Sequence, residues 1–70
     1  MIIEIGIVAG EIWQLLDKHG TLRIGEINAK LQRAEYLILM SLGWLGREGH
    51  IVVDWKEGDL YKEYKVTLRK

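Results

Sequence analysis

The chain has 70 residues, ten Lys and Arg against ten Asp and Glu, and neither cysteine nor proline. This length predicts a single domain, residues 1–70, with one small core that buries about 60% of the unfolded surface. The lack of cysteine excludes disulfides, thiolate zinc sites and thiol catalysis, and it fits a cytoplasmic protein. The balanced charge disfavours a function built on phosphate contacts. No apolar run approaches the roughly 20 residues of a membrane span.

The first predicted element is a helix from about Ile3 to Lys18. Apolar residues recur there at helical spacing, and Gly20 follows as a stop signal. The residues expected to face the core are Ile5, Val8, Ile12, Leu15 and Leu16.

The next elements are short. Residues 21–24 are predicted to form a small strand, and residues 25–31 a short helix that turns its apolar side inward. Residues 32–34 fit the tight turn between two helices. A third helix then runs to about residue 48, with Gly49 as its stop.

The third helix is apolar on almost every side. At 100° per residue, Ile38, Leu42 and Leu45 share one line, flanked by Leu37 and Trp44. The opposite side carries Tyr36, Leu39, Met40 and Gly43, with Arg47 as its only cation. A helix that is apolar all round is typical of a buried helix.

A two-stranded hairpin is predicted to end the chain. Residues 51–55 alternate in the manner of a half-buried strand, the pair Glu57-Gly58 can form a turn, and residues 60–68 return. The expected register sets Lys56 opposite Asp59, Trp55 opposite Leu60 and Ile51 opposite Tyr64. The inward residues would be Ile51, Val53, Trp55, Tyr64, Val66 and Leu68.

The predicted order is therefore helix, short strand, helix, turn, helix and hairpin. This order indicates an α+β fold of the winged helix-turn-helix type, in which the hairpin is the wing. Two motifs add to this interpretation: A-G-x-I-W at Ala9–Trp13 and L-G-W-L-x-R-E at Leu42–Glu48. They resemble those of a family of small single-domain winged helix-turn-helix proteins of uncharacterised role. The chain departs from that pattern at Gly46, where alanine is expected. The resemblance implies the fold and a tendency to pair with itself, and it supplies no catalytic or ligand residues.

The sequence offers no candidate for catalysis, a cofactor or a metal. Ser41 is the only serine, and its place in an apolar helix predicts a hydrogen bond to the preceding turn of that helix. His19 and His50 have no further histidine or carboxylate at the spacing of metal ligands. No glycine-rich phosphate loop is present. An enzyme, a cofactor site and a small-molecule substrate are therefore not expected.

A DNA-binding transcriptional regulator is the alternative function, because the fold is suited to it. The residues that could serve are Arg33 and Arg47 around the third helix, and Lys56 and Lys62 on the wing. The expected tip of the wing, residues 56–59, carries a net negative charge, which would repel phosphate.

The favoured function is a protein-interaction module that forms a homodimer. Two apolar stripes exceed the needs of one small core, and together they would make a patch of the kind that marks an interaction site. The predicted interface residues are Gly6, Gly10, Trp13, Tyr36, Leu39, Met40, Gly43 and Arg47.

Overall fold

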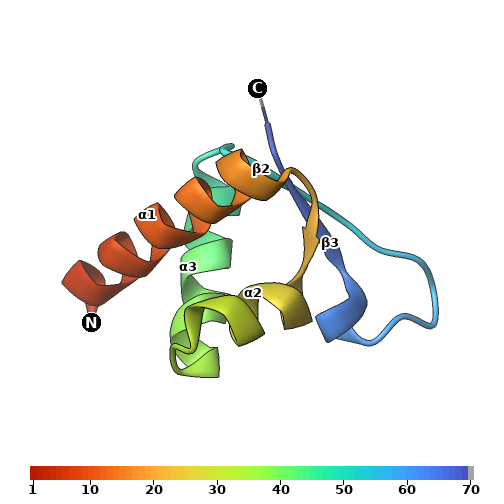
Figure 1. Cartoon of the computed structure of the whole chain (residues 1–70), viewed down its shortest axis with the longest axis horizontal. Coiled ribbons are helices and arrows are strands. Elements are labelled where there is room, and N and C mark those ends of the chain that lie inside the picture. Colours follow the sequence, from red (N-terminus) through yellow and green to blue (C-terminus); the bar gives the residue numbers. More distant parts are fainter. Residues whose placement is uncertain (70) are drawn as a thin grey trace.

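The computed structural model describes residues 1–69, in which α-helices pack against one face of an antiparallel sheet (Figure 1). In chain order the elements are α1 (Ile2–His19), β1 (Leu22–Arg23), α2 (Ile24–Leu31), α3 (Glu35–Arg47), β2 (Ile51–Asp54), the 3-10 turn η1 (Tyr61–Glu63) and β3 (Lys65–Leu68). The predicted fold class and the predicted order of elements are confirmed. The N-terminal end of α1 and the loop between β2 and β3 lie at opposite ends of the long axis.

Two glycines end the long helices, as their positions predicted. Gly20 adopts a φ of 83° and its N–H donates to the Leu16 carbonyl at 2.7 Å. Gly49 adopts a φ of 76° two residues after the end of α3 at Arg47. Left-handed backbone of this kind favours glycine because a Cβ would crowd the carbonyl oxygen. The turn between α2 and α3 also uses a left-handed residue, Gln32, with a φ of 51°.

The core lies where α1 and α3 cross above α2 and the inner face of the sheet. Ile12, Ile27, Ile38 and Val66 are fully buried at its centre. Each comes from a different element, so one small core joins all three helices to the sheet. The expected core residues of α1 divide into two groups: Val8, Ile12 and Leu16 are buried, whereas Ile5 and Leu15 are half-buried at the edge.

The sheet has the order β1-β3-β2, so that the last strand lies in the middle. Ile51 pairs with Leu68, and Val53 pairs with Val66. The predicted hairpin register, with Ile51 opposite Tyr64, was therefore wrong by four residues. Because four is an even number, Val66 and Leu68 still face the core.

The error in register has a local cause in the loop after β2. The expected turn does form, since the Asp59 N–H donates to the Lys56 carbonyl at 3.0 Å. The chain then enters η1 instead of a strand, and the Glu63 carboxylate accepts the Leu60 N–H at 2.9 Å. The Tyr64 carbonyl accepts the Ile24 N–H at 3.0 Å, which ties this segment to α2. These bonds delay strand pairing until Lys65.

Trp55 was expected to face the core, and this was also wrong. Its side chain is 58% exposed and stacks on the ring of Tyr64, with centroids 5.8 Å apart. The strand β2 ends at Asp54, so Trp55 lies beyond the sheet. Val53, also expected inside, is 40% exposed.

Candidate functional site

The side of α3 that faces away from the core is apolar and uncovered. We call it the outer face of α3, and it consists of Tyr36, Leu39, Met40, Gly43 and Arg47. Leu39 is 39% exposed, Met40 47% and Tyr36 53%. Each of these residues is more exposed than Leu37, Ile38, Leu42 and Leu45 of the same helix, all of which are buried. No segment within residues 1–69 covers this face.

A second apolar surface lies on α1, next to the end of α3. Gly6, Gly10 and Trp13 are all exposed, and an apolar hollow of about 430 Å³ lies between the two helices. It is lined by Ile2, Ile5, Gly6 and Trp44. The hollow therefore connects the apolar surface of α1 with that of α3.

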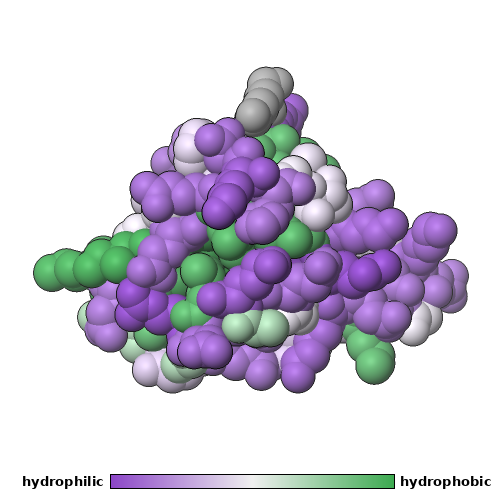
Figure 2. Space-filling model, in the orientation of Figure 1, coloured by the Kyte–Doolittle hydropathy of each residue, from purple (hydrophilic) through white to green (hydrophobic). Residues whose placement is uncertain are grey.

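Polar side chains cover most of the molecule on the side shown in Figure 2. Hydrophobic residues gather most clearly at the projecting end of α1, and smaller hydrophobic areas lie near the centre of this face and at its lower right. Large exposed apolar side chains also lie on the sheet and the wing loop, among them Val52, Trp55 and Leu60.

The apolar, uncharged stripes on which Gly10 and Gly43 lie in the sequence predict a close contact between helices at each, either within the chain or across a dimer. Within the chain this expectation was wrong, because a Cβ built at Gly6, Gly10 or Gly43 would meet no atom within 4 Å. The close approach occurs instead at Gly25, where a Cβ would lie 3.3 Å from the Lys62 carbonyl oxygen. Contact across a dimer stays a prediction.

The difference in free space around Gly10 and Gly43 on the one hand and Gly25 on the other can be measured as a difference in stability. Replacing Gly10 or Gly43 with alanine should raise the free energy of unfolding by about 0.5–1 kcal/mol in dilute solution, because alanine favours the helix and finds open space. Gly25→Ala is the matched control and should gain less or lose stability. Urea denaturation at low protein concentration measures all three. A loss of stability in Gly43→Ala equal to that of Gly25→Ala would contradict the open space around Gly43.

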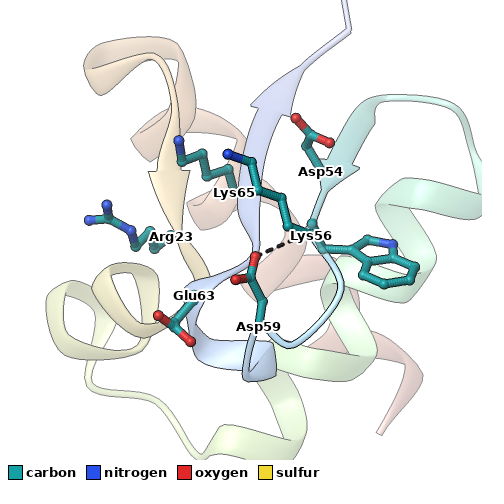
Figure 3. A pocket seen from close by; sticks show the side chains of 7 residues that line it. Arg23, Asp54, Lys56, Asp59, Glu63 and Lys65 are labelled. Atoms are coloured by element: carbon teal, nitrogen blue, oxygen red, sulfur yellow. Dashed lines mark hydrogen bonds between the residues drawn. The ribbon is translucent and has the colours of Figure 1, made fainter.

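A polar cleft of about 200 Å³ lies at the base of the wing (Figure 3). It is lined by Trp55 and by three cations and three carboxylates, namely Arg23, Lys56, Lys65, Asp54, Asp59 and Glu63. Asp59 turns toward the main chain and accepts the Lys56 N–H at 2.9 Å. In the sheet, Lys65 lies between Arg23 on one side and Asp54 on the other. The charges balance, so the cleft has no net attraction for a polyanion.

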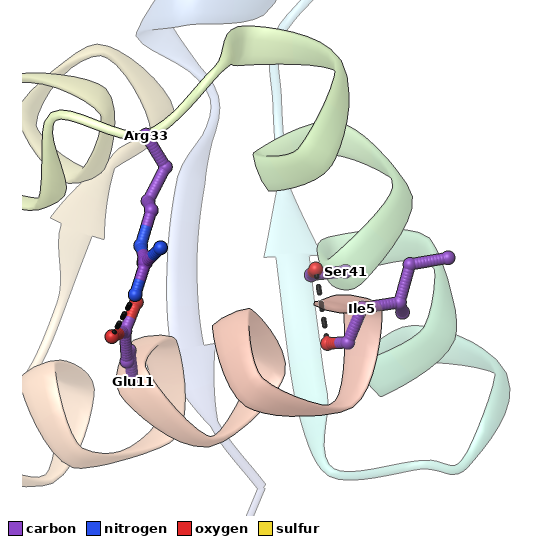
Figure 4. Close-up of polar contacts among 4 residues, drawn as sticks. All are labelled: Ile5, Glu11, Arg33 and Ser41. Atoms are coloured by element: carbon purple, nitrogen blue, oxygen red, sulfur yellow. Dashed lines mark hydrogen bonds and ion pairs between the residues drawn. The ribbon is translucent and has the colours of Figure 1, made fainter. Parts of the chain in front are cut away.

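Arg33, a candidate for DNA contact, is held within the chain. Its guanidinium donates two hydrogen bonds to the Glu11 carboxylate, at 3.0 Å and 2.6 Å, which join the α2–α3 turn to α1 (Figure 4). The hydrogen bond to Glu11, and then the negative charge of that carboxylate, raises the pKa of Arg33 above its ordinary value. This arginine is therefore engaged with a carboxylate instead of being free for phosphate.

The other DNA candidates lie on separate segments. Arg47 is exposed at the end of α3, Lys56 lines the polar cleft, and Lys62 lies in η1. None of the three lies on the same element as another, and none lies in the α2–α3 turn that holds Arg33.

Ser41 is fully buried and plays a different part from the expected one. Its hydroxyl donates to the Ile5 carbonyl of α1 at 3.2 Å, and not to the preceding turn of its own helix (Figure 4). The crossing of α1 over α3 brings that carbonyl within reach. Ser41 thus fixes the contact between the two helices.

Residues 1–69 contain no group of three or more His, Asp or Glu side chains that could hold a metal ion. Among the helices they form, none has both the length and the apolar character needed to cross a bilayer.

A comparison with known protein families identifies the family of this chain. The chain matches the family described as Winged helix-turn-helix domain (DUF2582) over residues 2–64. It belongs to this family. The winged helix-turn-helix domain also superposes on the solution NMR structure of protein BT2368 from Bacteroides thetaiotaomicron with a TM-score of 0.76. That protein is 25% identical, and the match covers 93% of this chain and 74% of the other. No curated protein matches the chain.

In winged helix-turn-helix domains that bind DNA, the helix in the position of α3 enters the major groove. Base reading there requires polar and basic side chains on the outer face of that helix. In this domain the outer face presents Tyr36, Leu39 and Met40, and one cation, Arg47. α3 therefore occupies the position of a DNA-reading helix, but its outer face lacks most of the polar and basic side chains that base reading requires.

The sequence interpretation missed part of the exposed apolar surface. Trp44 was expected to flank the core and is 47% exposed. Ile2, Ile3 and Ile7 were not assigned to any surface, and they are 85%, 79% and 54% exposed. The sequence does contain a signal for this surface: Glu4 is the only residue with a polar side chain among residues 2–10, so this part of α1 has apolar side chains on more sides than one core can cover.

Proposed function

We propose that this domain is a non-enzymatic protein-interaction module that pairs with a second copy of itself through the outer face of α3. The observation that carries the proposal is the exposure of Tyr36, Leu39 and Met40 on the side of α3 opposite the core. Exposed apolar side chains that gather on one face mark interaction sites more often than isolated ones do.

The energetic argument concerns burial. At 39% and 47% exposure, Leu39 and Met40 each forgo somewhat less than half of the roughly 1.5–3 kcal/mol that full burial of such a side chain contributes. A two-fold pair would cover the same face on both copies, since a symmetric interface uses one self-complementary patch twice. Gly43 lies in the middle of the face and has no Cβ, so a partner helix could approach there. Arg47 would then lie at the rim, within reach of Glu35 or Glu48 of the second copy.

DNA binding is the second candidate function, and one observation favours it. The outer face of α3 is not covered within the chain, and Arg47 has no ion pair among residues 1–69. Against it stand the engagement of Arg33 with Glu11 and the balanced charge of the cleft under the wing. Pairing through α3 would also hide the surface that a DNA-reading helix presents, so the two functions would compete.

Sedimentation velocity separates the two functions. We expect the pure protein to move from monomer to dimer between low and high micromolar concentration. A mixed-sequence DNA duplex should bind only weakly, with an affinity that falls steeply as salt is added. A monomer at high micromolar concentration would contradict self-association. Nanomolar affinity for a specific duplex at physiological salt would establish the second function.

A further inference from the structure

The N-terminal half of α1 is apolar on nearly every side, but only the side with Val8 and Ala9 is buried in the core of the domain. Among residues 2–10 only Glu4 has a polar side chain, and a helix that is apolar all round is suited to burial. Yet Ile2, Ile3 and Ile7 are 85%, 79% and 54% exposed. This end of α1 projects from the body of the domain and forms its apolar tip (Figures 1 and 2).

We infer that this segment, residues 2–10, is an arm that packs on the outer face of α3 of a second copy. The inference rests on the proposed self-association and identifies a second part of the interface. In a two-fold pair the contact would form twice, with each arm lying on the other copy.

The area of the interface supports this assignment. Taking about 200 Å² for a fully exposed large side chain, the large residues of the outer face of α3, with Trp44 beside them, offer roughly 400 Å². A stable interface of standard size takes about 800 Å² from each partner. Ile2, Ile3 and Ile7 add roughly another 400 Å² on the same scale. The arm therefore supplies the area that α3 alone lacks.

The continuity of the two surfaces gives a second argument. The apolar hollow lined by Ile2, Ile5, Gly6 and Trp44 lies between the arm and the end of α3. The arm and the outer face are thus adjacent parts of one apolar surface, so a partner that covers the outer face of α3 also lies beside the arm.

The charges on the two surfaces are compatible. Glu4 is the only charged side chain of the arm; it is 58% exposed and pairs with the N-terminal ammonium of Met1 at 3.2 Å. Arg47 is the only charged residue on the outer face of α3 and has no ion pair within residues 1–69. Placing an arm on a partner's α3 would let the Glu4 carboxylate, which can accept from more than one cation, meet Arg47 as well.

Sedimentation equilibrium of a double variant tests the arm. Ile3→Ser with Ile7→Ser should raise the dimer Kd at least tenfold, because two exposed apolar side chains would lose their burial on the partner. Val52→Ser with Leu60→Ser is the matched control, since these side chains are 48% and 72% exposed on the sheet and the wing loop. It should change the Kd by less than about twofold. Circular dichroism melting in dilute solution confirms that both variants fold.

The outcomes separate the two proposals. If the parent protein dimerises and the arm variant dimerises as tightly as the control, the arm does not take part in the interface. The proposal of self-association would still stand. If the parent is a monomer at high micromolar concentration, both proposals fail.

Cysteine cross-linking tests which surface the arm meets. The chain contains no cysteine, so each variant carries a single thiol. Mixing an Ile3→Cys chain with a Tyr36→Cys chain of different tag length should give a mixed disulfide under mild oxidation. Efficient cross-linking of Ile3→Cys to itself, without the mixed product, would show that the arms pair with each other and would overturn the assignment.

Discussion

Replacing Leu16 with alanine should lower the free energy of unfolding by about 2–5 kcal/mol. The Leu16 side chain is 1% exposed, in the part of α1 that covers the core, so its removal leaves a cavity that rigid neighbours fill only in part. A domain of this length has roughly 4–10 kcal/mol of stability in total. The substitution therefore removes a large share of it.

Urea denaturation followed by tryptophan fluorescence measures this loss. Leu60→Ala is the matched control, because it deletes the same atoms from a side chain that is 72% exposed. Its free energy of unfolding should change by less than about 0.5 kcal/mol. Equal midpoints for the two variants would contradict the placement of the core.

Leu39→Arg should weaken the proposed dimer at least a hundredfold while leaving the fold intact. Two-fold symmetry places the new charge in the interface twice, near Arg47, and a buried charge without a partner strongly destabilises an interface. The monomer should tolerate the change, since Leu39 is already 39% exposed. Sedimentation equilibrium gives the Kd, and melting in dilute solution gives the stability.

Val52→Arg is the control for this experiment. Val52 is 48% exposed on the outer side of the sheet, away from the proposed interface, so its replacement should leave the dimer unchanged. A Leu39→Arg variant that remains as dimeric as Val52→Arg would exclude the outer face of α3 as the contact surface.

The helices of this domain could be predicted from the sequence because their apolar spacing and their stop residues agree. Val8, Ile12 and Leu16 recur at helical spacing and are all buried, and Gly20 ends α1 as expected. The wing could not be predicted to the same degree. Its register depends on two hydrogen bonds, in which the Glu63 carboxylate accepts the Leu60 N–H and the Tyr64 carbonyl accepts the Ile24 N–H, and alternation alone does not specify them.

The candidate surface could be predicted only in part, for a reason of packing. Helical periodicity shows which residues share a side of α3, and it therefore placed Leu39 and Met40 on the side opposite Ile38. Periodicity does not show how much of the length of α3 is covered by α1. The hydrogen bond from Ser41 to Ile5 marks where α1 crosses α3. Beyond that crossing Trp44 is left uncovered, and no pattern within α3 could indicate this.

The order of strands has a consequence for how the domain forms during synthesis. The central strand, β3, leaves the ribosome after the other elements that the structure describes, and both edge strands depend on it for every pairing in the sheet. The three helices can begin to associate earlier, but β1 and β2 stay without partners until β3 emerges. During that interval their unpaired edges and the apolar residues Leu22 and Ile51 would be open to aggregation or to chaperones.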